Sequence, residues 1–251
     1  PIRIAEDYAM ALTQVAPSIS VWLGGHSPAK DTRARVVDLP DGNAAPFESG
    51  STLLAPLTAD QTSLLLMAAQ QSAKLDFPSP RGWISQGLAG YAQVRYIEQE
   101  KSLETAQAYL QTHREALIVA ERSLPGSDPA AHSLINSTDE FYVRIKAANV
   151  WWMLRELIGE TALTAALHKY KAEEDKDAMY IQRLIEAQSH RDLTWFFNDW
   201  VYRDRGLPDF RIASVFSREV MSGGYVVTVT VENLGGAAAE IPVILRMTAR
   251  D

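Results

Sequence analysis

The stretch from Thr58 to Gln93 constrains the fold of this chain more than any other. Its first half repeats apolar and small residues at helical spacing, which predicts a helix with one buried face. Those residues are Leu64, Leu65, Ala68 and Ser72. Thr58 and Gln61 form a candidate capping box at the helix start. Pro78 and Pro80 end the helix, because proline lacks an amide hydrogen and restricts the residue before it. The stretch therefore predicts two helices joined by a short bend.

The second of these helices opens with the phrase W-I-S-Q-G-L-A-G-Y, which spans residues 83–91. Gly87 and Gly90 lie within it, and a glycine presents no side chain to a neighbour. We therefore expect another element to approach this helix closely at the two glycines. Trp151 and Trp152, further along the chain, are expected in the core.

The phrase at 83–91 resembles the third-ligand motif of the M1 aminopeptidases, the gluzincins with a thermolysin-like fold. In that family one helix carries H-E-x-x-H, and the next supplies a third zinc ligand within W-L-N-E-G-F-A-x-Y. Gln86 stands where the family has the ligand glutamate. Gln70, Gln71 and Lys74 stand in the H-E-x-x-H positions of the preceding helix. The resemblance therefore implies a zinc site in which the ligands and the catalytic glutamate are all replaced.

A second alignment keeps the family's usual spacing and places Ser63, Leu64 and Met67 in those positions. Neither alignment supplies a histidine or a carboxylate. Catalytic zinc needs about three good protein donors, whereas a glutamine amide is a weak donor and an ammonium repels the metal. Glutamine also cannot take a proton from water. We therefore predict no metal and no other cofactor. In the alternative interpretation these polar residues simply face solvent on an ordinary helix.

Glu48 is the candidate residue on the sheet side of this site. Segment 47–54 resembles the family's G-A-M-E-N segment, so the resemblance implies that Glu48 binds a substrate amino group. The alternative is a glutamate at an exposed strand entry. We also expect the Lys74 ammonium to take the place of the metal, because a partly buried charge needs polar partners. Its candidate partners are Gln70, Gln86 and Glu48. Alternatively, Lys74 extends its charge into water.

Segment 141–159 resembles another helix of the family, Y-x-K-G-A-x-x-L-x-M-L-R-x-x-x-G, with Lys146 in step. The family's tyrosine on this helix stabilises the oxyanion of the transition state. Arg144 occupies that position here, and Tyr142 lies two residues earlier on a different face of the helix. Tyr142 and Glu48 are our candidate substrate-binding residues, and no residue at the degenerate positions is expected to act catalytically.

Helical periodicity continues over most of the chain. The further helices are expected at 4–15 with an end near Pro17, at 101–123, at 141–159 with Ser137 and Glu140 as a capping box, at 161–171, at 178–188 and at 192–203. The last contains F-F-N-D-W-V, which resembles the phrase closing the helical part of M1 enzymes. A small sheet at 33–40 and 47–54 is expected to precede the two central helices.

Beyond Pro208 the pattern changes to the alternation of half-buried strands. Three strands are expected, at 209–216, 225–232 and 241–248. Three strands are too few for a closed sandwich, so they resemble the first part of the family's β-sandwich domain. We therefore predict an α+β, mainly helical fold: a thermolysin-like domain with a small leading sheet at 1–206, and an incomplete β-sandwich at 207–251.

Composition excludes some classes of function. The chain has 251 residues, 47% of them hydrophobic and 22% charged, with a net charge of -7 and no basic block. We therefore predict no nucleic-acid partner. No apolar run is long enough to span a bilayer. There are no cysteines, which excludes disulfides and thiolate metal sites. The start at Pro1, without a methionine, favours a segment of a longer precursor, and we favour a secreted or periplasmic bacterial location.

None of the five histidines is followed by glutamate, so no H-E-x-x-H occurs in the chain. We therefore predict an M1-like domain that has lost its zinc chemistry and serves as a module binding peptides or a protein partner, or as a scaffold. Two alternatives stay open. One is an active zinc aminopeptidase whose ligands lie elsewhere, and the other is a deliberately inactivated peptidase.

Overall fold

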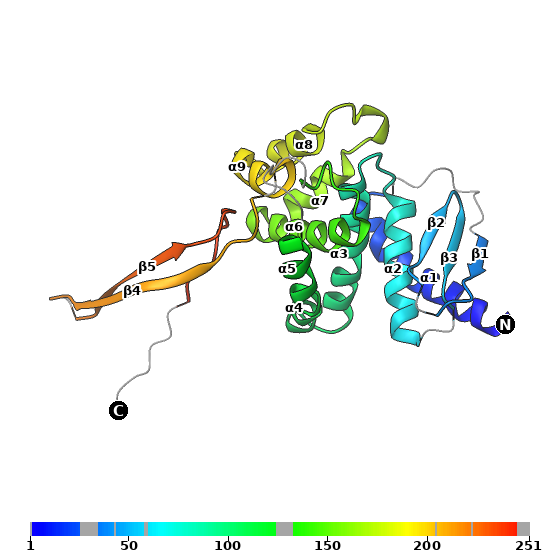
Figure 1. Cartoon of the computed structure of the whole chain (residues 1–251), viewed down its shortest axis with the longest axis horizontal. Helices are drawn as coiled ribbons and strands as arrows, with labels where there is room; N and C mark the ends of the chain where they lie inside the picture. The colour runs from blue at the N-terminus through cyan, green and yellow to red at the C-terminus, as the bar shows by residue number, and fades with distance from the viewer. Residues whose placement is uncertain are drawn as a thin grey trace.

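The computed structural model describes residues 2–25, 35–42, 44–57, 60–123, 133–203, 205–221 and 223–244. It shows a mainly helical body with a small sheet at one end and a long two-stranded ribbon projecting from the other (Figure 1). No helix in these described ranges is long and apolar enough to cross a membrane. The predicted α+β, mainly helical class is therefore confirmed.

The helices are α1 (Ile2–Leu23), α2 (Gln61–Asp76), α3 (Gly82–Glu100), α4 (Leu103–Thr112), α5 (Arg114–Ser123), α6 (Glu140–Ile158), α7 (Glu160–His168), α8 (Tyr180–Ser189) and α9 (Thr194–Phe197). A 3-10 turn at Ala172–Glu174 precedes α8, and a π-helical turn at Asn198–Tyr202 continues α9. The strands are β1 (Arg35–Asp38), β2 (Phe47–Ser49), β3 (Thr52–Ala55), β4 (Phe210–Glu219) and β5 (Tyr225–Asn233).

The close approach predicted at the glycines of α3 is confirmed, and the approaching element is α6. A Cβ on Gly87 would lie 2.5 Å from the Ala147 Cβ and 2.8 Å from the Trp151 Nε1. Trp151 is fully buried and stacks on Trp83, with ring centroids 5.3 Å apart. The α3–α6 contact is therefore the centre of the core, and the missing side chain at Gly87 makes it possible.

The bend between α2 and α3 is held by a buried polar network. Arg81 Nε donates to Asp175 Oδ1 at 2.6 Å, and the Tyr170 hydroxyl donates to Asp175 Oδ2 at 2.7 Å. The Ser79 hydroxyl lies 2.8 Å from the Tyr170 hydroxyl. Because the Asp175 side chain is wholly buried, these donors supply the partners that its charge requires. The network fixes how α2 turns back into α3.

Ionic contacts join α3 to α6 and α7. Arg155 on α6 is bonded to Glu98 on α3, and Arg95 lies 2.7 Å from Glu98 and 2.8 Å from Glu160. Burial favours a raised pKa for Glu98, but the hydrogen bond and charge of Arg155, helped by Arg95, hold that pKa below its usual value. The cluster adds charge-assisted contacts at the edge of the α3–α6 core.

The leading sheet has the order β1-β3-β2, with β1 parallel and β2 antiparallel to β3. The edge strand β2 faces α2, and α1 packs against α2 (Figure 1). The predicted end of the first helix near Pro17 is wrong, since α1 runs through the proline to Leu23. Ile19, Trp22 and Leu23 continue its buried face. Burying those side chains outweighs the cost of about 3 kcal/mol for an internal proline.

Several helix boundaries also differ from the predicted ones. Asp60 caps α2 through the amides of Thr62 and Ser63, whereas Thr58 lies outside the described residues. Asp139, not Ser137, caps α6. The helix expected at 101–123 is two helices, α4 and α5, separated at His113. At the starts of α2 and α6 a short aspartate accepts from free backbone amides, and the periodicity of apolar residues does not report such partners.

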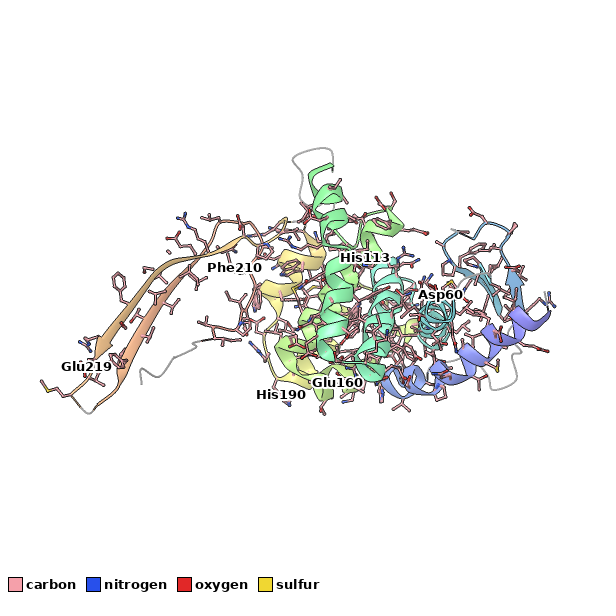
Figure 2. All side chains as sticks on the ribbon, turned by 90° about the horizontal axis from the view of Figure 1, so that it is seen from below. Asp60, His113, Glu160, His190, Phe210 and Glu219 are labelled. Atoms are coloured by element: carbon pink, nitrogen blue, oxygen red, sulfur yellow. The ribbon has the colours of Figure 1, made fainter. Side chains whose placement is uncertain are left out.

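The C-terminal ribbon consists of β4 and β5, paired antiparallel with an irregularity between Ile212 and Ser214. In Figure 2 Phe210 lies near the helical body and Glu219 near the far tip of the ribbon. The third strand expected at 241–248 is not formed at Ile241–Ile244, and 245–248 lie outside the described residues. The start of a β-sandwich, and the boundary at 206–207, stay predictions.

Candidate functional site

The candidate site lies where α2 meets the edge of the leading sheet. Gln70, Gln71 and Lys74 project from the second half of α2, after the start that Asp60 fixes. Gln70 and Gln71 are buried, and the side chain of Lys74 is 13% exposed. The alternative in which these polar residues face solvent is therefore wrong. Their burial requires each of them to have a polar partner.

Gln71 is bonded to the sheet through both ends of its amide. Its Nε2 donates to the backbone oxygens of Phe47 on β2 and Leu54 on β3, each at 3.1 Å. Its Oε1 accepts a hydrogen bond from the hydroxyl of Tyr8 on α1. Burial, and then the negative charge of Glu48, raise the pKa of Tyr8, so this phenol stays a donor. Gln71 therefore connects α1, α2 and the sheet.

Lys74 forms an ion pair with Glu48 on β2. Lys74 Nζ lies 2.8 Å from Glu48 Oε2, and each side chain is 13% exposed. The predicted contact between the Lys74 ammonium and Glu48 is therefore confirmed, and Glu48 does not lie at an exposed strand entry. Glu48 Oε1 is buried without a hydrogen-bond partner in the described part of the chain. The carboxylate is thus occupied on one oxygen by an ammonium from its own chain.

The two remaining motif positions do not join this ion pair. Gln70 Oε1 accepts from Gln93 Nε2 at 3.2 Å, and Gln93 Nε2 also donates to the Leu66 oxygen. The Tyr109 hydroxyl on α4 donates to Gln93 Oε1, so Gln70 belongs to a network joining α2, α3 and α4. Gln86 is half-buried. It was a candidate partner of Lys74, but the ion pair found is with Glu48.

The second alignment supplies no ligands either. Leu64 and Met67 are buried apolar residues. Ser63 lies at the start of α2, where its hydroxyl donates to Asp60 Oδ2 at 2.7 Å. All three therefore have structural roles in the helix and its core.

Tyr142 and Arg144 lie on α6, in different surroundings. The Tyr142 hydroxyl donates to Glu121 Oε2 at 2.7 Å, and Lys146 Nζ donates to the Tyr142 hydroxyl at 2.6 Å. Arg144 packs beside Gly90 and over the ring of Phe141. These contacts place Tyr142 in an α5–α6 cluster, whereas Glu48 belongs to the α2–sheet contact. Substrate binding by Tyr142 and Glu48 stays a prediction.

The sequence interpretation did not include Tyr8 in the site. Tyr8 falls on the same buried face of α1 as Ala11 and Val15, so its burial could be read from helical spacing. Its hydrogen bond to Gln71 could not, because the two residues are 63 positions apart.

The donors present do not suit zinc. Within the described ranges, no group of three or more histidine, cysteine, aspartate or glutamate side chains could hold a metal ion. The motif positions provide amides and an ammonium, and the Gln71 amide is already bonded to two carbonyls and a phenol. Zinc prefers imidazole, thiolate and carboxylate donors. The side chains at the position where the resemblance implies the metal therefore do not form a zinc site.

Comparison with solved structures defines the class of fold. The chain is similar to an M1 zinc metallopeptidase from Deinococcus radiodurans, with a TM-score of 0.56 and 20% identity over 79% of this chain and 45% of that one. A mutant of the M1 zinc metallopeptidase from the same organism gives a TM-score of 0.55 at 20% identity, covering 79% and 45%. A two-domain M1 mutant bound to L-tryptophan gives 0.58 at 20% identity, covering 78% and 44%.

This protein therefore has an M1 metallopeptidase-like fold. The chain spans less than half the length of these structural neighbours. No family model matches the sequence, and no curated protein matches it.

Proposed function

We propose that this chain is a non-catalytic module with an M1-like fold, which binds a peptide or a protein partner or serves as a scaffold. The observation that carries the proposal is the ion pair between Lys74 and Glu48 beside the hydrogen-bonded amide of Gln71. An ammonium and an amide occupy the helix positions where the resemblance places a zinc ligand and the catalytic glutamate.

The chemistry of these groups supports the loss of hydrolysis. An amide has no basic site that could take a proton from water at neutral pH, so Gln71 cannot act as the general base. A positive charge at Lys74 opposes the binding of a dication in the same place. Losing both a metal-bound nucleophile and its base removes several rate effects, each worth orders of magnitude.

The occupied carboxylate also bears on how a ligand would bind. The resemblance assigns to Glu48 the amino group of a substrate, but Lys74 already supplies an ammonium at 2.8 Å. A peptide bound to this domain is therefore not expected to depend on a free amino terminus. Recognition through the peptide backbone or side chains fits a binding module better than an aminopeptidase.

Metal content and turnover test the proposal together. The dialysed protein is expected to contain far less than about one zinc ion per chain. Release of dye from aminoacyl-arylamide substrates should stay at background, with and without chelator. One zinc ion per chain, together with chelator-sensitive turnover, would overturn the proposal and support an active peptidase.

A calorimetric comparison then separates a binding module from a scaffold. A mixed peptide library is titrated in two forms, with free and with acetylated amino termini, and recovered peptides are checked for cleavage by mass spectrometry. Equal heats without cleavage are expected for a binding module. Absence of heat from both libraries would leave the scaffold role, and heat from the free form alone would contradict the role given to Lys74.

A further inference from the structure

We infer that Gln71 and Lys74 form a clasp that fastens α2 to the edge of the leading sheet, so that both residues stabilise the fold. The clasp consists of the hydrogen bonds of Gln71 to Phe47, Leu54 and Tyr8, together with the Lys74–Glu48 ion pair. The clasp rests on the proposed function in one respect: both place Gln71 and Lys74 at the H-E-x-x-H positions of the family.

The amide of Gln71 suits its surroundings in a way that a carboxylate does not. Two backbone carbonyl oxygens, of Phe47 and Leu54, accept from its Nε2, and a phenol donates to its Oε1. A glutamate of the same size could still accept from Tyr8. It would present an oxygen without a proton to two other oxygens, so both hydrogen bonds of the Nε2 amide would be lost and acceptors would face each other. Residue 71 must therefore both donate and accept.

Lys74 completes the clasp one helical turn further along. Its ammonium balances the charge of Glu48, whose other carboxylate oxygen is buried without a partner in the described structure. Removing the ammonium alone would leave a mostly buried carboxylate uncompensated, which costs more than removing both charges. The Gln71 hydrogen bonds and the Lys74–Glu48 ion pair together hold α2 to β2. They lie where the resemblance implies a metal.

One consequence is that restoring the family's catalytic glutamate should damage the fold. The variant Gln71→Glu is expected to lower Tm by about 5–10 °C at about pH 8. Among the described residues, Tyr8 on α1, Glu48 on β2 and Lys74 on α2 are titratable groups close to this position. Burial raises the pKa of the introduced carboxyl, because the Lys74 ammonium already balances the charge of Glu48, and the protonated form of the carboxyl can donate to one carbonyl.

The deficit of this variant against wild type is therefore largest above the folded-state pKa and shrinks as the pH falls. At about pH 5 the difference in Tm should be less than half of that at about pH 8. The matched control is Gln61→Glu, an exposed position in the first turn of the same helix. A negative charge at a helix start is favourable, so its Tm should stay within about 1 °C of wild type.

A double-mutant cycle tests the second half of the clasp and does not depend on whether Gln71→Glu folds. Lys74→Met is expected to lower Tm by about 5 °C, and adding Glu48→Gln should recover part of that loss. The control cycle uses Lys171 and Glu174, an ion pair whose side chains are 57% and 51% exposed. Lys171→Met and Glu174→Gln should each change Tm by about 1 °C or less, and additively.

The outcomes separate this inference from the proposed function. A stable Gln71→Glu protein with no pH-dependent deficit, or an additive Lys74–Glu48 cycle, would overturn the clasp even in an inactive protein. Zinc binding with turnover would overturn the proposed function whatever these variants do. A pH-dependent deficit together with a non-additive cycle supports the clasp.

Discussion

The helical body buries its apolar side chains, whereas the β4–β5 ribbon exposes many of them. In the body, helices α3 and α6 bury tryptophans, glycines and alanines against each other. In the ribbon, Ile212, Val215 and Tyr225 are all more than half exposed. β4 and β5 form a two-stranded sheet, which in the described structure gives neither strand a second neighbour. The same kind of side chain is therefore a structural requirement in one region and nearly free to change in the other.

The two regions are joined by polar contacts close to the base of the ribbon. The Trp200 indole donates to the Ala238 oxygen at 2.8 Å, and Asp199 accepts from the Ala238 amide at 3.1 Å. Asn233 donates to the Ala237 oxygen at 2.8 Å. Residues 237–238, which follow β5, are thereby held against the π-helical turn after α9, and the two strands stay uncovered. The body therefore holds only the base of the ribbon, and the apolar faces of β4 and β5 stay exposed.

The largest effect is expected at the α3–α6 contact. Gly87→Ala should lower the free energy of unfolding by about 3 kcal/mol, because its Cβ overlaps Ala147 and Trp151. Urea unfolding measures the change. Gly82→Ala is the matched control, since a Cβ there meets nothing within 4 Å at the start of the same helix. It should be neutral or stabilising by up to about 1 kcal/mol. Equal effects at both glycines would contradict the close contact.

An intermediate effect is expected at the ionic cluster of the body. The folded-state pKa of Glu98 is lowered, so its contribution is present above the unfolded pKa and is lost as the pH falls through the folded pKa. Glu98→Gln should cost about 1 kcal/mol at neutral pH and progressively less in acid. Unfolding at several pH values measures this. Glu100→Gln, an exposed change on the same helix, should cost little at any pH, and a parallel pH profile for the two variants would refute the assignment.

The smallest effect is expected in the ribbon. Val215→Thr should change the free energy of unfolding by less than about 0.5 kcal/mol, because the side chain is 56% exposed and both residues favour strands. The same substitution at the fully buried Val150 on α6 should cost about 1–2 kcal/mol, since it brings a hydroxyl into the core. Denaturant unfolding of both variants gives the comparison. A comparable loss at Val215 would show that the ribbon is covered in solution.

Much of the body could be predicted from local patterns. The prolines at 78 and 80 end α2, the glycines of α3 allow the approach of α6, and the alternation after Pro208 gives the two ribbon strands. The end predicted at Pro17 was wrong because the cost of a proline inside a helix is a local effect. The apolar side chains that follow Pro17 on α1 are buried, and this burial offsets that cost. The third strand at 241–248 failed over Ile241–Ile244, where strand-like composition did not come with strand pairing.

The sequence by itself determined which chemical groups stand at the motif positions, because residue identity fixes donors, charges and the absence of imidazole. It also indicated the M1-like fold, since the order of the helices and phrases is kept when the ligands change. Only the tertiary structure decided what those groups do. Glu48, Gln71 and Tyr8 come from three separate segments, and the bond of Gln71 to Tyr8 and the ion pair of Glu48 with Lys74 depend on how α1, α2 and β2 are packed. Polar residues on an isolated helix could face water. In this fold the packing buries them and places them in contact with one another.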